Sequence, residues 1–152
     1  MGAIVGLDCD LAYNTGTHAA PVLVSISKAI DVELSMGANT ATFASRESSW
    51  EAGRVALKTL SATFGYEYEA STDTTFDALF TAYDNKTIQE YYFMDGSVLL
   101  TGSEGIRAYC MITEFSWNQP LQDGVVVSAS LQLARFEEGS VVIEPDWHTL
   151  DW

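Results

Sequence analysis

The chain has 152 residues, 47% of them hydrophobic, which is enough for one domain with a single core. Its 21 acidic and 7 basic residues give a formal net charge of -14, and the basic residues are scattered singly, which excludes tight nucleic-acid binding. Apolar runs fall far short of the ~20 residues that cross a bilayer, and no secretory signal opens the chain, so we expect a soluble protein without a membrane partner.

Residues 1–21 are predicted to form an irregular N-terminal arm. Asn14-Thr15-Gly16 is typical of a turn, and a proline closes the segment. Apolar and polar residues then alternate over 30–36, which predicts a strand with one buried face. Asp31 and Glu33 are expected to share its polar face.

A hairpin is expected next. Residues 37–40, Gly-Ala-Asn-Thr, are predicted to form its tip, with a short returning strand at 41–45 and a polar loop after it. The clearest strand is predicted at 55–69, where aromatic and aliphatic residues alternate with polar ones. Its polar face carries Glu67 and Glu69.

One helix is predicted, at about 74–84. Asp73 or a neighbouring hydroxyl residue can cap its start, and Asn85 can end it. Its apolar residues fall at i, i+3, i+4 and i+7 and form one stripe for packing against a sheet: Phe76, Leu79, Phe80 and Tyr83.

Three further segments complete the β pattern. Strands are predicted at 88–94, 106–117 and 125–133. The alternation within the second slips by one residue, which predicts a bulge near Thr113-Glu114. Residues 137–152 are predicted to form a C-terminal arm.

The predicted fold class is mainly β: an antiparallel β-sandwich or partly closed barrel with one flanking α-helix and extended arms at both ends. The β domain is expected to span 22–136, between arms at 1–21 and 137–152.

No motif indicates catalysis. His18 and His148 both fall in the predicted arms, where a pre-organised general base is not expected. Asp8-Cys9-Asp10 lacks calcium-loop spacing, and Cys9 and Cys110 lie about a hundred residues apart without a CxxC motif. We therefore predict no catalytic, cofactor-binding or metal-binding residues, and no enzyme activity.

The order of the elements carries more information than any motif. The segments are Ser-Lys-Ala-Ile-Asp-Val-Glu-Leu (27–34), Ala-Ser-Arg (44–46), the loop around Trp50, Lys-Thr-Leu-Ser-Ala-Thr-Phe-Gly-Tyr (58–66), Asp-Asn-Lys-Thr (84–87), Asp-Gly (95–96) and Met-Ile-Thr-Glu-Phe-Ser-Trp-Asn-Gln-Pro-Leu (111–121). Over roughly residues 22–136 this series resembles the major tail tube proteins of long-tailed bacteriophages.

The resemblance implies a structural virion protein, related to the tube protein of type VI secretion. Such subunits form hexameric rings that stack into the tail tube, with arms and an extended loop between rings. The implied partners are copies of the same chain, the tape measure protein, and the tail terminator and tip proteins. DNA would pass through the tube without tight binding during ejection. The implied location is the virion tail, assembled in the host cytoplasm.

The resemblance also gives the acidity a role, because carboxylates on a tube wall repel phosphates over a Debye length of roughly 8–10 Å. The lumen-facing candidates are Asp31, Glu33, Glu67 and Glu69. The candidates for inter-ring or arm contacts are Trp50, Trp147, Leu150 and Trp152.

Two other functions fit the composition. A capsid decoration or tail-completion protein would also be an acidic β domain, but it would stop at one ring. A β-sandwich that binds a carbohydrate or another ligand would use exposed tryptophan and tyrosine side chains.

Overall fold

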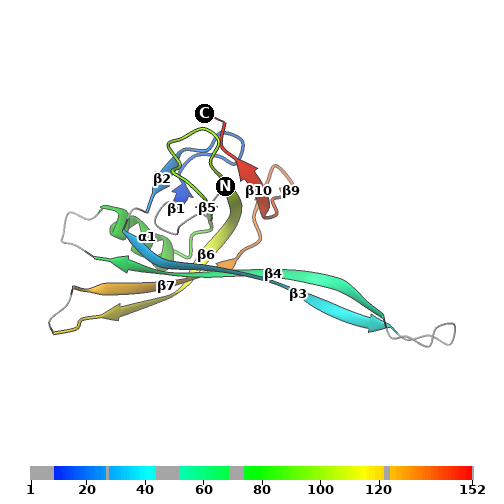
Figure 1. The fold of residues 1–152 in the computed structure, drawn as a ribbon, viewed down its shortest axis with the longest axis horizontal. Coiled ribbons are helices and arrows are strands. Elements are labelled where there is room, and N and C mark those ends of the chain that lie inside the picture. Colours follow the sequence, from blue (N-terminus) through cyan, green and yellow to red (C-terminus); the bar gives the residue numbers. More distant parts are fainter. Residues whose placement is uncertain (1–8, 27, 44–51, 69–73, 122–123, 152) are drawn as a thin grey trace, which may run out of the picture.

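The computed structural model describes residues 9–26, 28–43, 52–68, 74–121 and 124–151. Ten strands and one helix follow one another in this part of the chain (Figure 1). They are β1 (Asp10–Asn14), β2 (Leu23–Ser25), β3 (Ala29–Phe43), β4 (Ala52–Glu67), α1 (Thr74–Asp84), β5 (Gln89–Met94), β6 (Glu104–Asn118), β7 (Val126–Leu133), β8 (Glu137–Glu138), β9 (Val141–Val142) and β10 (Asp146–Thr149).

Eight strands form one antiparallel sheet in the order β2-β1-β5-β6-β7-β4-β3, with β10 paired to β6. The long strand β6 serves both halves: its first part lies between β5 and β10, and its second part pairs with β7. The sheet therefore folds over into two layers, with β1, β2, β5 and β10 above β3, β4 and β7 in Figure 1. It is not closed into a barrel, because the path of described strands ends at β2 and β3. The predicted mainly β sandwich with one helix is confirmed.

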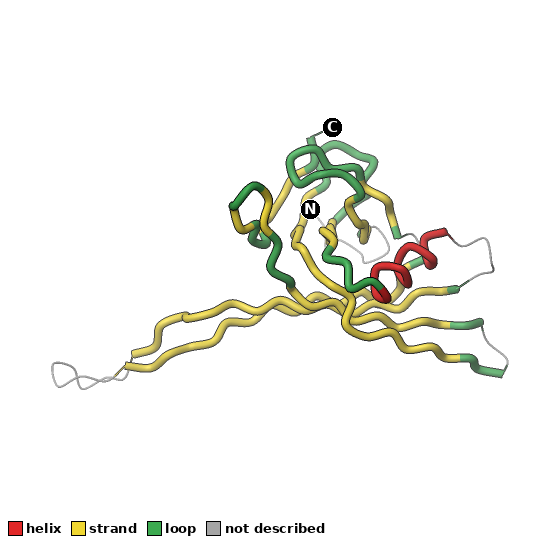
Figure 2. Tube along the Cα trace, turned by 180° about the vertical axis from the view of Figure 1, so that it is seen from behind, coloured by secondary structure: helices red, strands yellow, loops and turns green. Residues whose placement is uncertain are grey.

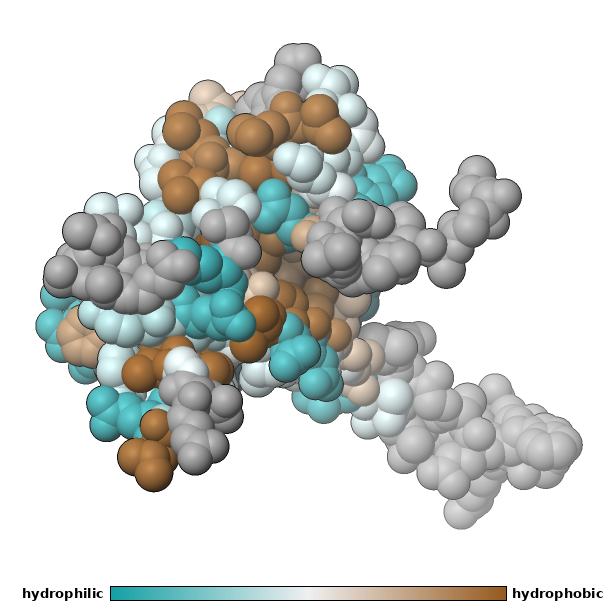
Figure 3. Space-filling view, turned by 60° about the vertical axis from the view of Figure 1, so that its left-hand side comes forward, coloured by the Kyte–Doolittle hydropathy of each residue, from teal (hydrophilic) through white to brown (hydrophobic). Residues whose placement is uncertain are grey.

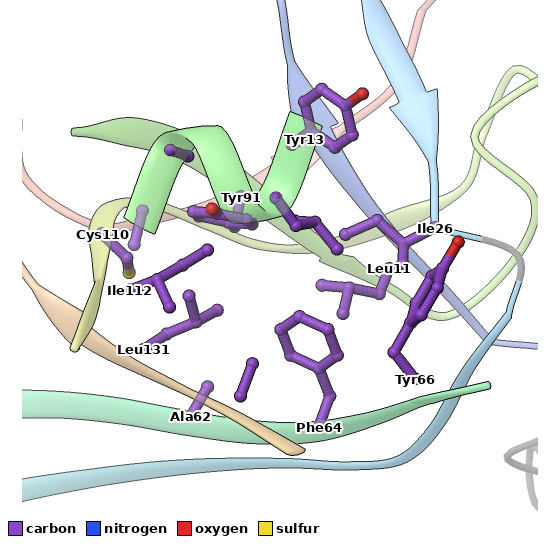
Figure 4. Close-up of a cluster of buried hydrophobic side chains, with 14 of the residues drawn as sticks. Leu11, Tyr13, Ile26, Ala62, Phe64, Tyr66, Tyr91, Cys110, Ile112 and Leu131 are labelled. Atoms are coloured by element: carbon purple, nitrogen blue, oxygen red, sulfur yellow. The ribbon is translucent and has the colours of Figure 1, made fainter. Parts of the chain in front are cut away.

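The core lies between the two layers (Figure 4). Phe64 and Tyr66 of β4 and Leu131 of β7 point up from the lower layer, and Leu11 of β1 and Tyr91 of β5 belong to the upper one. All five are buried. Burial of each large apolar side chain stabilises the fold by roughly 1.5–3 kcal/mol, so the inward positions of these strands hold the layers together.

The helix α1 has the predicted bounds, Thr74–Asp84. Leu79 and Ala82 are buried against the sandwich. Its C-terminus is a Schellman motif, in which the backbone N–H of Thr87 donates to the Ala82 carbonyl (2.9 Å) and that of Lys86 to the Tyr83 carbonyl (3.2 Å). Lys86, and not Asn85, takes the left-handed conformation that ends the helix (φ 55°). No helix in the described part of the chain is long and apolar enough to cross a membrane.

The hairpin tip predicted at 37–40 is wrong. Strand β3 continues through these residues, with Gly37 opposite Thr59 and Ala38 opposite Lys58. The β3–β4 hairpin projects from the body of the molecule (Figures 1 and 2), so a glycine here meets solvent and its partner strand, and no turn is needed. Strand β3 ends at Phe43 and β4 begins at Ala52, and residues 44–51 lie outside the described residues.

Parts of both predicted arms pair with the sheet. Strand β1, within 1–21, lies between β2 and β5. Strand β10, within 137–152, pairs with β6. Strand β1 shows no alternation of apolar and polar residues, because four of its five residues are buried. The sequence pattern therefore does not reveal it. The division into arms and a central domain stays a prediction.

Two irregularities shape the lower layer. The predicted bulge near Thr113-Glu114 is confirmed as a register shift between Ile112 and Glu114. A second shift, between Ile30 and Glu33, places two residues of β3 opposite one residue of β4. Such bulges bend a strand and change which side of the sheet its later residues face.

Candidate assembly surface

The solvent side of the lower layer is a regular surface formed by β3, β4, β7 and the second part of β6. Residues that lie opposite each other in antiparallel strands point to the same side, so the register separates core from solvent positions. Thr63 lies opposite Glu33 and Ser130, and Ser130 lies opposite Glu114. We call the solvent side the outer sheet face; it comprises Ile30, Glu33, Ser35, Gly37, Thr59, Ser61, Thr63, Gly65, Glu67, Met111, Glu114, Ser116, Asn118, Val126, Ser128, Ser130 and Gln132.

The outer sheet face has an unusual composition. Serine, threonine and glycine make up about half of it, and its charged members, Glu33, Glu67 and Glu114, are all acidic and exposed. Lysine and arginine do not occur among these residues. A surface without cations cannot neutralise phosphates, and its carboxylates repel them within about a Debye length, roughly 8–10 Å.

The structure places the predicted acidic residues in different surroundings. Glu33 and Glu67 lie on the outer sheet face. Asp31 does not share that face with Glu33, because it lies in the β3 bulge with a positive φ of 50°. It lines an open hollow of about 720 Å³ together with Trp147. Glu69 lies outside the described residues.

Sequence reasoning missed Glu114 as a member of this surface. Its position after the bulge, opposite Ser130, brings it to the outer sheet face. The slip in alternation at 113–114 was the available signal, because a bulge reverses the side on which the following residues lie.

Among the described strands, both lateral edges of the lower layer lack a partner strand. Within the described residues β3 pairs with β4 alone, and residues 111–118 of β6 pair with β7 alone. An unpaired edge presents a row of backbone N–H and C=O groups that can pair with another chain. The four strands alternate in direction, so β3 and β6 run in opposite directions.

Two of the four residues predicted to form inter-ring or arm contacts are described, and they lie in different surroundings. Trp147 is 61% exposed and lies opposite Ile106. Leu150 is 1% exposed, and its side chain packs within its own chain in a cluster with Tyr92 and Val98. Trp50 and Trp152 lie outside the described residues.

A buried carboxylate holds the loop after β1. Glu90 of β5 accepts a hydrogen bond from the Asn14 side-chain amide (3.0 Å) and contacts Nδ1 of His18 at 2.6 Å. Its side chain is 1% exposed. A buried carboxylate needs such partners, so the contacts fix the loop on the upper layer. His18 therefore has a structural place in the fold.

A second polar group holds the C-terminal strand. Arg107 of β6 donates to both carboxylate oxygens of Asp146 in β10 (2.8 and 3.1 Å) and to the Tyr92 hydroxyl (3.4 Å). Burial raises the pKa of Tyr92 to about 12. The ring of His148 lies 6.0 Å from that of Tyr92. These side chains join β10 to β6.

Potential metal ligands and nucleophiles can be placed within the described residues. In the described part of the chain, no group of three or more histidine, cysteine or acidic residues is placed to hold a metal ion. Cys9 is exposed, whereas Cys110 is buried in the core. Burial raises the pKa of the Cys110 thiol to about 12, so it is not a nucleophile near neutral pH.

Comparison with solved structures places this architecture among tail components. The SPP1 tail tube matches with a TM-score of 0.75 and 15% identity, covering 98% of this chain and 81% of that one. The chain has a tail tube fold. The tail of an empty gene transfer agent particle matches with a TM-score of 0.62 and 16% identity, over 87% of this chain and 95% of that one.

A similar fold also occurs in a contractile injection system. A chain of an extracellular contractile injection system, the PVC sheath–tube complex, matches with a TM-score of 0.65 and 7% identity, covering 97% of this chain and 93% of that one. No protein-family model matches the sequence, and no curated protein matches it either. At these identities the likeness lies in the fold and not in shared side chains.

Proposed function

We propose that this chain is the structural subunit of a phage-type tail tube, which assembles into stacked rings around a conduit for DNA. The observation that carries the proposal is the lower layer, a four-stranded antiparallel sheet open at both edges. The tail tube fold supports it, because the similar structures include an assembled tail tube and a particle tail.

Ring closure follows from strand direction. Because the four strands alternate, β3 of one copy and β6 of a copy related by rotation run antiparallel to each other. An even number of strands therefore lets identical copies continue one sheet around a ring, and a closed ring leaves no open lateral edge. The contact is heterologous, since it joins two different edges.

The ring is proposed to be a hexamer. The gene transfer agent tail that this chain resembles was refined with C6 symmetry, and a second similar structure, the baseplate of the anti-feeding prophage, was six-fold symmetrised. Repeated stacking of such rings would make the tube. The tape measure, terminator and tip proteins are the proposed partners at its interior and its ends.

The outer sheet face is the proposed wall of the lumen. Glu33, Glu67 and Glu114 supply negative charge, and the surrounding hydroxyl side chains are small and uncharged. DNA would slide past such a wall, because no cation holds its phosphates. The role is mechanical, not enzymatic, and its location is the virion tail.

Electron microscopy of the purified protein tests the proposal. We expect rings or hollow tubes, whose length increases with protein concentration because each ring offers a surface to the next. Helical reconstruction of those tubes should show β3 of one copy beside β6 of its neighbour, antiparallel, with the outer sheet face toward the axis. Monomers at every concentration would overturn the proposal, and single rings that never stack would favour a completion protein.

A further inference from the structure

An aromatic cluster lies beside the open edge of β6. Phe80 and Tyr83 of α1 contact Phe115 of β6, with ring centroids 6.3 and 5.3 Å apart, and Phe76 contacts Trp117 at 6.1 Å. Phe115 lies opposite Ala129, which is buried, so the cluster is on the core side of the lower layer. The cluster therefore lies at the end of the core that is nearest to the open edge of β6.

Three rings of the cluster are exposed in the single chain. Phe80 is 48% exposed, Trp117 48% and Tyr83 38%. Figure 3, in which the left side of Figure 1 comes forward, shows hydrophobic side chains next to hydrophilic ones on this side of the molecule. Asp77 and Asp84 lie three residues before and four after Phe80, so exposed carboxylates flank the exposed ring on one side of the helix.

The opposite edge of the same layer has a matching surface. Met36 of β3 lies opposite Leu60, which is buried, so it faces the core side and is nevertheless 59% exposed. Val32, in the bulge opposite Phe64, is 44% exposed. Lys58 and Met36 line the same hollow. The edge of β3 thus offers apolar side chains beside a cation.

We propose that α1 of one copy covers the core-side face of β3 in the next copy, which closes the hydrophobic core between neighbours in a ring. The inference rests on the proposed ring, because β3 and β6 become neighbours only when the edges pair. Once they pair, Val32 and Met36 lie on the same side of the continuous sheet as Phe80 and Trp117. Apolar surface meets apolar surface, and the carboxylates of α1 approach Lys58.

Photo-crosslinking in assembled tubes tests this contact. Benzoylphenylalanine at position 80 keeps an aromatic ring at the exposed point of the cluster. After irradiation of full-length protein in tubes, we expect covalent dimers whose crosslinked peptides map position 80 to β3 of another chain, within residues 29–38. The matched control carries the photoreactive residue at Thr81, which is exposed and points about 100° away round the helix, and should give much less of that product.

The outcomes separate this contact from the ring itself. Tubes that form normally but crosslink position 80 to another segment, or only within its own chain, would overturn the α1–β3 contact and leave the tube function standing. Failure of the unmodified protein to form rings would overturn the tube function instead.

Assembly of a variant gives an independent readout. Phe80 is half exposed in the single chain, so Phe80→Ser should preserve the circular dichroism spectrum. If α1 covers β3, the variant should raise the critical concentration for assembly about tenfold, the effect of losing about 1.4 kcal/mol of contact. Thr81→Ser should leave it unchanged. An unchanged value for Phe80→Ser would contradict the contact.

Discussion

At the scale of single residues, the absence of a Cβ atom at Gly105 lets strand β6 pack closely against β5. Gly105 lies between Met94 of β5 and His148 of β10. A Cβ atom added at Gly105 would be 1.9 Å from the Phe93 carbonyl oxygen, which is backbone and cannot turn aside. Glycine is required here by a close approach of two backbones.

Gly105→Ala should destabilise the monomer by about 2 kcal/mol or more, because the clash can be relieved only by moving a strand. Urea denaturation followed by tryptophan fluorescence measures the change. Gly124→Ala is the control, since a Cβ there meets nothing within 4 Å. A Gly105 variant as stable as the control would contradict the close approach of β5 to β6.

His148 should make stability depend on pH. Burial and the nearby Arg107 charge lower the pKa of His148 in the folded chain, so the unfolded chain binds the proton more readily. The free energy of unfolding should therefore fall as the pH drops below about 6.5, the ordinary value for histidine. His148→Gln should flatten this slope between about pH 7 and 5, where most carboxylates stay ionised. Equal slopes in thermal melts of the two proteins would refute the effect.

At the scale of elements, alternation along each strand separates core from surface. On β7, Val127, Ala129 and Leu131 are buried, whereas Ser128 and Gln132 are exposed on the outer sheet face. One strand thus serves two functions, with one side holding the layers together and the other forming the candidate wall.

Substitutions at two adjacent positions of β7 should reduce stability by very different amounts. Leu131→Ala should cost about 2–5 kcal/mol, because it removes buried methyl groups and leaves a cavity between the layers. Gln132→Ala, one residue along, should change stability by less than about 0.5 kcal/mol. Chemical denaturation of both monomers measures the difference. Similar losses for both would mean that the register of β7 is not the one described.

At the scale of the whole molecule, charge and open edges act together. The net charge of -14 makes copies repel one another, yet the open edges of β3 and β6 and the exposed aromatic cluster favour their association. Assembly should therefore strengthen as salt screens the repulsion.

Reversal of the wall charge tests the proposed lumen. Tubes of Glu33→Lys/Glu67→Lys should still form, because both side chains lie on the outer sheet face, opposite the side that α1 of the next copy is proposed to cover, but should retain short double-stranded DNA and impair ejection. Co-sedimentation of labelled DNA with tubes at low salt measures retention. Glu137→Lys/Glu144→Lys makes the same charge change on exposed residues outside the sheet face and is the control. Equal retention by the two variants would exclude the outer sheet face as the wall.

The elements with strong periodicity were predictable. The alternation of β4, β6 and β7 reflects burial on one side, which a sequence records directly. The stripe of α1 was predicted to pack against the sheet, but of its four residues Leu79 alone is buried, and Phe80 and Tyr83 are exposed. Strand β1 was not predictable from alternation, because both of its sides are covered. The continuation of β3 through Gly37 was missed because both sides of the projecting hairpin meet solvent, so turn-type residues there do not mark a turn.

The sequence by itself determined the β class, the helix, the excess of acid and the positions of Glu33 and Glu67 on polar sides of their strands. Only the tertiary structure decided which of these sides form one surface. The bulge in β3 separates Asp31 from Glu33, and the bulge in β6 brings in Glu114, since one extra residue changes the side on which a strand's later residues lie. Open edges are also invisible in a sequence, because pairing depends on which strands the fold leaves without a neighbour.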